Sequence, residues 1–122
     1  MIEQIKIFLY WNIPSKKNSK IWTWRYLLSS KKYREWEEYH LQQILWINRI
    51  FREEQWLKIE CIFYRWDKRK FDLSNSFESI ADLFVKASII QDDNMTILSD
   101  ISLKFWWYDK ENPRCEILIT KI

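Results

Sequence analysis

The chain has 122 residues, a length that fits one compact domain. Its 48% hydrophobic content, with nine Trp, six Tyr and seven Phe, excludes a disordered or low-complexity chain. The net charge of +3 is too small to identify a nucleic-acid binder unless the basic residues cluster. The absence of glycine excludes the glycine-rich loops that bind nucleotide phosphates, so no nucleotide cofactor is expected. Left-handed turns should then fall to Asn, Asp or another residue that tolerates that conformation at some cost, and the candidates are Asn12, Asn18, Asn94 and Asn112.

The two cysteines and the hydropathy of the chain indicate the cellular compartment in which we expect the protein. Cys61 and Cys115 have no metal-ligand spacing, and their apolar neighbours predict that both are buried as small hydrophobic residues. The sequence has no recognisable signal peptide and no apolar run long enough to span a membrane. We therefore expect a protein of the reducing cytoplasm with no membrane partner.

The first half of the chain predicts a strand, a loop and a long helix. Apolar residues at every second position predict a half-buried strand from Ile2 to Trp11. The stretch from Ser15 to Ser30 has no sustained period and is predicted to be a basic, aromatic loop. A helix is predicted from about Lys31 to Glu54, with His40 on its apolar face. A lone histidine in such a position is more often a core residue than a catalyst.

The second half predicts a strand, a helix and two strands. A strand over 57–64 leads into the basic segment 65–70, and Ser74 or Asn75 is expected to cap a helix of about fourteen residues that runs to Ala87. Strands are predicted over 96–108 and 115–122, with a hairpin loop between them. Trp106 and Trp107 should face opposite sides of their strand, one in the core and the other exposed or in an interface.

The order of these elements is strand, helix, strand, helix, strand, strand. With no internal repeat and no linker, it predicts an α/β (α+β) fold: one two-layer domain over residues 1–122, in which a mixed β-sheet packs against two main helices. A sheet domain of this size is a candidate for dimerisation through a sheet edge or a helix face.

Acidic side chains gather within 68–98, directly after the basic segment. The candidates are Asp72, Glu78, Asp82, Asp92 and Asp93. A phosphodiester hydrolase needs converging carboxylates that hold a divalent cation, because the cation activates water and neutralises charge on the phosphate. Helices also commonly carry solvated acids, so the cluster has two readings until the pattern is considered.

The pattern is a strand-end Asp, an Asn three residues on, a helix with a further Asp, and an Asp pair before the next strand. The residues that fit it are Asp72, Asn75, Asp82, Asp92 and Asp93. In this the chain resembles the RusA family of small dimeric Holliday-junction resolvases. The segment 13–20, IPSKKNSK, is similar to the proline, serine, asparagine and basic loop of that family.

Three positions depart from the best-known members of the family. Ser74 stands where they have a second Asp, Glu78 where they have a Lys, and Ser88 where a helix-ending Gly is usual. Because Glu78 can supply the charge that Ser74 cannot, we expect one carboxylate to have moved by about one helical turn. The serine at position 88 should affect stability more than function.

The resemblance implies a homodimeric endonuclease, encoded by a bacterium or phage, that resolves branched DNA such as four-way junctions with Mg²⁺ or Mn²⁺. The implied catalytic residues are Asp72, Glu78, Asp82 and Asp93. Asp72 and Asp93 are the implied metal ligands, with Glu78 or Asp82 completing the ligand set and Asp92 supporting it from nearby. A helix of fourteen residues spans roughly 20 Å, so Asp72 and Asp93 converge only if the chain beyond Ser88 runs back along the helix.

Basic and aromatic side chains supply the predicted DNA contacts. The phosphate contacts are expected from Lys16, Lys17, Lys20, Lys68, Arg69, Lys70, Asn75 and Lys86. Trp22, Trp24 and Tyr26 either stack on bases or pack in a core or dimer interface. Two alternatives stay open: a junction-binding protein that does not cleave, and a module that binds protein through an exposed apolar patch.

Overall fold

The computed structural model describes residues 4–14, 20–22, 27–29, 31–47, 50–51 and 56–122. Its strands are β1 (Gln4–Tyr10), β2 (Lys20–Trp22), β3 (Leu27–Ser29), β4 (Leu57–Arg65), β5 (Leu98–Tyr108) and β6 (Arg114–Lys121). Its helices are α1 (Lys31–Ile44), a short 3₁₀ turn η1 (Leu45–Ile47), and α2 (Leu73–Lys86). The predicted order of strands and helices and the α+β class are confirmed, and β2 and β3 form an additional small hairpin in the segment predicted as a loop.

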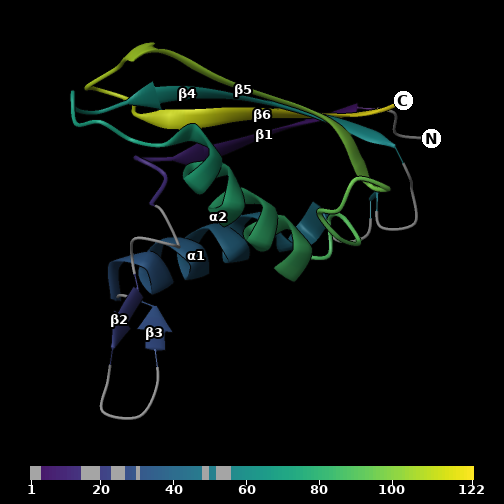
Figure 1. Cartoon of the computed structure of the whole chain (residues 1–122), viewed down its shortest axis with the longest axis horizontal. Helices are drawn as coiled ribbons and strands as arrows, with labels where there is room; N and C mark the ends of the chain where they lie inside the picture. Colours follow the sequence, from purple (N-terminus) through teal and green to yellow (C-terminus); the bar gives the residue numbers. More distant parts are fainter. Residues whose placement is uncertain (1–3, 15–19, 23–26, 30, 48–49, 52–55) are drawn as a thin grey trace.

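A four-stranded mixed sheet forms one layer of the domain, in the order β1-β6-β4-β5. β6 pairs antiparallel with both β1 and β4, whereas β5 runs parallel to β4. Both helices lie on the same side of this sheet (Figure 1). Since α2 connects the parallel strands β4 and β5, its N-terminus lies near the end of β4 and its C-terminus near the start of β5.

The core lies between the sheet and the two helices, and strand alternation selects its members. In β4 every second residue is buried, from Leu57 to Arg65, so the last position of an apolar row is occupied by a cation. On α2 the buried residues include Ile80, Leu83 and Phe84, which recur at helical spacing. Cys61 and Cys115 are free and buried, as predicted.

Two local predictions, on the length of α1 and on the burial of a tryptophan in β5, were wrong. α1 ends at Ile44 rather than near residue 54, because the backbone N–H of Phe51 bonds to the carbonyl of Ile89 and the chain has left the helix by then. Trp106 and Trp107 are both exposed, at 54% and 64%, since they lie on an edge strand whose pairing with β4 shifts register beside them.

The left-handed positions also differ from the predicted candidates. Positive φ values occur at Trp11 (70°), Trp56 (59°) and Ser88 (58°) among the described residues, and at none of the asparagines there. Asn18 lies outside the described residues. Position 88, a serine where the RusA-like pattern usually has a helix-ending Gly, is one of the left-handed residues.

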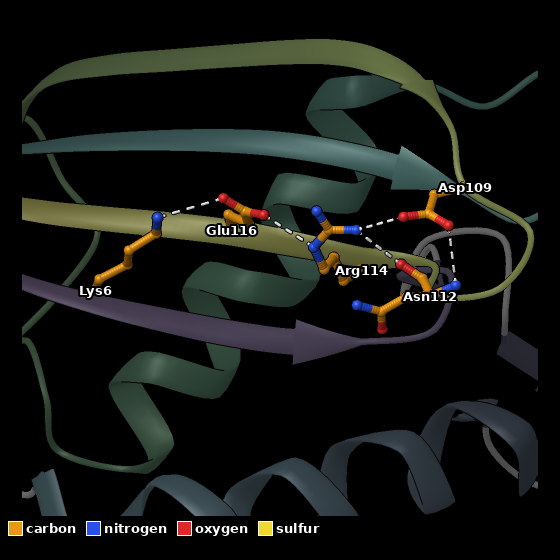
Figure 2. Close-up of polar contacts among 5 residues, drawn as sticks. All are labelled: Lys6, Asp109, Asn112, Arg114 and Glu116. Carbon is orange, nitrogen blue, oxygen red and sulfur yellow. Dashed lines mark hydrogen bonds and ion pairs between the residues drawn. The ribbon is translucent and has the colours of Figure 1, made fainter.

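The open face of the sheet carries a polar network that fixes the β5–β6 hairpin (Figure 2). Arg114 bonds to Glu116 through Nε at 2.9 Å and to Asp109 through Nη1 at 2.8 Å. Its Nη1 also donates to the carbonyl of Asn112 at 3.0 Å, and Lys6 lies 3.4 Å from Glu116. These contacts hold Asn112 and Pro113 in place beside the end of β1.

Candidate nucleic-acid interface

A cleft of about 270 Å³ lies at the N-terminal end of α2, and we call it the basic cleft. Its lining residues are Asn12, Ile13, Pro14, Lys32, Arg65, Asp67, Arg69, Lys70, Phe71, Asp72, Asn75 and Ser76. Four cationic side chains and two carboxylates are among them, so the cleft is electropositive. Of the predicted phosphate contacts, Arg69, Lys70 and Asn75 lie here, together with the predicted metal ligand Asp72.

Arg65 lies at the base of this cleft and was not singled out from the sequence. It is only 8% exposed, and its guanidinium stacks over the ring of Phe71 at 4.0 Å. Burial lowers the pKa of Arg65. The carboxylate of Asp67, 3.8 Å away, opposes that shift. Arginine nevertheless stays protonated in proteins. Its Nε has no hydrogen-bond partner within the described part of the chain. The strand alternation was the available signal, because it places Arg65 on the helix side of the sheet.

Asp72 is the N-cap of α2, a role that the sequence analysis gave to Ser74 or Asn75. Its Oδ1 accepts hydrogen bonds from the backbone N–H of Ser74 (2.9 Å) and of Asn75 (3.3 Å), and from the hydroxyl of Ser74 (2.6 Å). Because Asp72 occupies these helix N–H groups, an anion in the basic cleft has to be bound mainly by side chains.

The remaining predicted carboxylates lie toward the other end of α2. Asp82 is ten residues beyond Asp72, which corresponds to about 15 Å along a helix. Asp93 lies near Asp82: burial raises the pKa of Asp93, the hydrogen bond and charge of Asp92 raise it further, and the charge of Asp82 adds to them. The pKa of Asp92 is lowered by hydrogen bonds from the backbone of Asp93 and the side chain of Asn94.

The carboxylates therefore form two sets, one at each end of α2. Glu78 is exposed and does not line the basic cleft. Within 4–14, 31–47, 50–51 and 56–122, no three His, Cys, Asp or Glu side chains form a group that could hold a metal ion. The predicted convergence of Asp72 and Asp93 is not seen within this single chain, and Asp67 is the carboxylate that shares the cleft with Asp72.

The other predicted DNA contacts have different surroundings. Lys86 forms an ion pair with Glu37 at 2.6 Å and so links α2 to α1. Lys68 lies 5.9 Å from the ring of Tyr108. Lys16 and Lys17 fall outside the described residues, as do Trp24 and Tyr26, and the side chains of Lys20 and Trp22 are not described either.

A second cleft, of about 470 Å³, adjoins the basic cleft, and we call it the aromatic cleft. Its lining residues are Tyr10, Trp11, Lys32, Glu35, Trp36, Tyr39, His40, Glu111, Asn112 and Pro113. Lys32 lines both clefts. The sequence gave no reason to select Trp11 as a site residue. It was predicted to be the last residue of the first strand, and in the structure it directly follows β1.

His40 is buried beneath the aromatic cleft and is a satisfied core residue, as predicted. Its Nε2 accepts the backbone N–H of Tyr10 at 2.9 Å, and its Nδ1 lies 2.9 Å from the carbonyl of Trp36. These partners require a neutral ring with the proton on Nδ1. Burial lowers the pKa of His40, although its bond to Trp36 acts in the opposite direction.

Comparisons with known proteins leave the family open. No protein-family model matches the chain, and no curated protein is significantly similar to it. No helix within the described residues is both long and apolar enough to cross a membrane.

Proposed function

We propose that this chain is a homodimeric, metal-dependent endonuclease that binds branched DNA, such as four-way junctions, and hydrolyses its phosphodiester bonds. The observation that carries the proposal is the basic cleft, in which four cations line the same space as Asp72. Asp72 is also the first residue of the motif that resembles the RusA family. A two-fold dimer suits the substrate, because resolution of a junction requires two symmetric cuts.

In this proposal the cations of the basic cleft bind and position the DNA backbone. Arg69 and Lys70 are exposed and can neutralise phosphates at the surface, whereas Arg65 provides a fixed charge deeper in the cleft. The buried, free cysteines suit an enzyme that acts in the cytoplasm on bacterial or phage DNA.

In this proposal a Mg²⁺ or Mn²⁺ ion would be held by the two carboxylates of the basic cleft together with the substrate, because no group of three metal-binding side chains occurs among the described residues. Mg²⁺ is usually held by one or two carboxylates together with phosphates of the substrate, and Asp67 and Asp72 supply two carboxylates here. When bound, the ion activates water and neutralises charge that develops on the phosphate. Asp72 is held in place by its cap hydrogen bonds, so its carboxylate is pre-positioned.

A second candidate function is junction binding without cleavage. It is favoured by the separation of the carboxylates, since Glu78 is exposed outside the cleft and Asp82 and Asp93 lie toward the far end of α2. Binding would depend on the cations alone and would therefore survive removal of any of these acids.

The deciding experiment uses a labelled synthetic four-way junction and a linear duplex, with Mg²⁺, with Mn²⁺ or with chelator. The variants are Asp72→Asn, Glu78→Gln and Asp93→Asn, with Asp100→Asn as the matched control because Asp100 is an exposed acid on β5. Asparagine is a good N-cap, so Asp72→Asn should keep α2 intact.

Paired, metal-dependent nicks that disappear in Asp72→Asn but not in Asp100→Asn are the expected result. Loss of cleavage in Asp93→Asn as well would show that both ends of α2 serve the same reaction. Junction binding without nicks in either metal would instead establish the second candidate. If the wild-type protein binds neither DNA, both functions are wrong.

A further inference from the structure

The aromatic cleft and the basic cleft meet at Lys32, which lines both. We propose that the aromatic cleft holds one unstacked nucleobase at the branch point of the DNA, while the adjoining phosphate lies in the basic cleft. This inference rests on the proposed DNA binding and adds a site for a base to it. It does not depend on whether the DNA is cleaved.

Trp11 forms a fixed wall of the aromatic cleft. Its ring is 55% exposed and stacks on the ring of Trp66, with centroids 6.1 Å apart and planes 23° apart. The backbone N–H of Trp11 bonds to the carbonyl of Pro113 at 2.7 Å, and Asn12 Oδ1 accepts the N–H of Trp66 at 2.9 Å. These bonds tie the end of β1 to the chain segments on either side of it.

The backbone at Trp11 is strained, with φ of 70° in the left-handed region. A bulky residue rarely adopts this conformation, and such strain clusters where the position of a side chain matters for binding. Here the left-handed turn leaves Trp11 exposed at the rim rather than in the core below it. A ring held in this way can stack with a base at little cost in conformational entropy.

The opposite side of the aromatic cleft is provided by α1. Tyr39 is 54% exposed and packs edge-on against His40, with ring centroids 4.9 Å apart. Because both nitrogens of His40 have backbone partners, this ring is itself fixed. Glu35 and Asn112 add polar groups to the lining, which can bond to the edges of a base.

Charge identifies the occupant as a nucleobase rather than an apolar peptide. The aromatic cleft has Lys32, Glu35 and Glu111 as its charged residues and shares Lys32 with the basic cleft, whose lining has four cations. A ligand that spans both clefts therefore combines a planar ring in the first with an anion in the second. A nucleotide within DNA has this chemistry. Bases at a branch point are already partly unstacked, which lowers the energy needed to extract one.

The test uses four-way junctions that carry 2-aminopurine either at the branch point or in an arm, bound by the full chain in chelator so that no cleavage occurs. Trp11→Leu and Tyr39→Ser remove the two walls. Trp46→Leu is the matched control, because Trp46 is 79% exposed and lies beyond the far end of α1. Circular dichroism and melting temperature establish that each variant is folded, and sedimentation gives its oligomeric state.

We expect the fluorescence of 2-aminopurine at the branch point to change when the wild-type protein binds, and the probe in the arm to stay unchanged. Removal of Trp11 should weaken junction affinity about tenfold and abolish the fluorescence change, and Tyr39→Ser should act in the same direction. Trp46→Leu should behave as the wild type.

Unchanged affinity and fluorescence in folded Trp11→Leu and Tyr39→Ser would overturn the inference. The proposed function would survive that result if Arg69→Gln and Lys70→Gln still weakened binding. A shift from dimer to monomer in Trp11→Leu would also overturn the inference, because the cleft would then be an interface between two copies. A wild-type protein that does not bind the junction would remove the proposed function as well.

Discussion

Both ends of α2 leave backbone polar groups without partners inside the helix, and the two ends satisfy these groups in different ways. At the N-terminal end Asp72 accepts three hydrogen bonds and stands beside the cations of the basic cleft. Beyond the C-terminal end, Ser88 closes a Schellman motif, and the adjacent carboxylates Asp92 and Asp93 follow it. The local fold therefore accounts for Asp72 by itself, whereas the raised pKa of Asp93 marks a carboxylate that the fold disfavours.

The largest expected contrast between the two ends concerns DNA affinity. The double variant Arg69→Gln/Lys70→Gln should bind a four-way junction at least tenfold more weakly, and the slope of log K against log salt should fall by about two, one for each lost phosphate contact. The double variant Asp92→Asn/Asp93→Asn should bind as well as the wild type or better. Titration by fluorescence anisotropy at several salt concentrations measures both quantities. Equal effects at the two ends would remove the basic cleft as the binding surface.

The next contrast concerns the N-cap itself. Asp72→Ala should lower the free energy of unfolding by about 1 to 2 kcal/mol, because α2 loses a capping side chain. Asp72→Asn should change it far less and should still abolish cleavage. Urea denaturation followed by circular dichroism measures the difference. If both variants are equally destabilised, the charge of Asp72 rather than its cap hydrogen bonds stabilises this end of the helix.

The fold was predictable because its elements obey local rules. Alternation located β4 and β6, and helical spacing located α2, including its length of 14 residues. The errors lie where tertiary contacts decide. The end of α1 depends on a bond between Phe51 and the distant Ile89, and the exposure of both Trp106 and Trp107 depends on which strand lies at the edge.

The candidate site was predictable only in part. The motif drew attention to Asp72 and Asn75, and the clustering of basic residues drew attention to Arg69 and Lys70; the structure places these four in one cleft. The other motif residues, Asp82, Asp92 and Asp93, do not line it. The motif could not reveal that Arg65 turns inward at the end of an apolar row, or that Lys32 and Trp11 approach the same place from α1 and β1. Those arrangements come from sheet topology, which joins segments far apart in the sequence.

The free energy of unfolding depends on pH partly through His40, the single histidine of the chain. This contribution has to be known before the effect of pH on the two ends of α2 is compared. Burial holds the folded pKa of His40 below the ordinary value of 6.5, so the unfolded state binds a proton more readily. The neutral His40 ring contributes fully to the stability of the folded protein above pH 6.5. This contribution is lost as the pH falls below that value, by up to about 1.4 kcal/mol per pH unit.

Urea denaturation between pH 8 and pH 5 should show this loss in the wild type, and His40→Gln should show a flatter profile from a lower starting stability. A wild-type profile that is flat over this range would mean that the ring tolerates protonation despite its bond from Tyr10.

At the C-terminal end, Ser88→Gly should stabilise the protein by about 0.5 to 1 kcal/mol. Ser88 has φ of 58°, and its N–H bonds to Val85 while that of Ile89 bonds to Phe84, which is the Schellman pattern. Glycine adopts this conformation without a Cβ clash, although it also gains freedom in the unfolded state. A rise in melting temperature with unchanged DNA affinity would confirm that position 88 affects stability alone. Ser88→Ala is the control and should not stabilise.

The smallest expected effect on stability, at Asp93, separates structure from function most clearly. The pKa of Asp93 is raised by burial, by its hydrogen bond to Asp92 and by the charge of Asp92, so at pH 7 its ionised form opposes folding. Asp93→Asn should therefore increase the free energy of unfolding by a few tenths of a kcal/mol, a small gain because the side chain is only partly removed from solvent, which screens the repulsion.

The gain should vanish below about pH 4, where the carboxyl is protonated in both states. If the same variant loses cleavage of a four-way junction while it gains stability, Asp93 serves the reaction at the expense of the fold. If cleavage is unchanged, the acids beyond α2 are solvated surface groups, and the reaction has to be assigned to the cleft of Asp72 and Asp67.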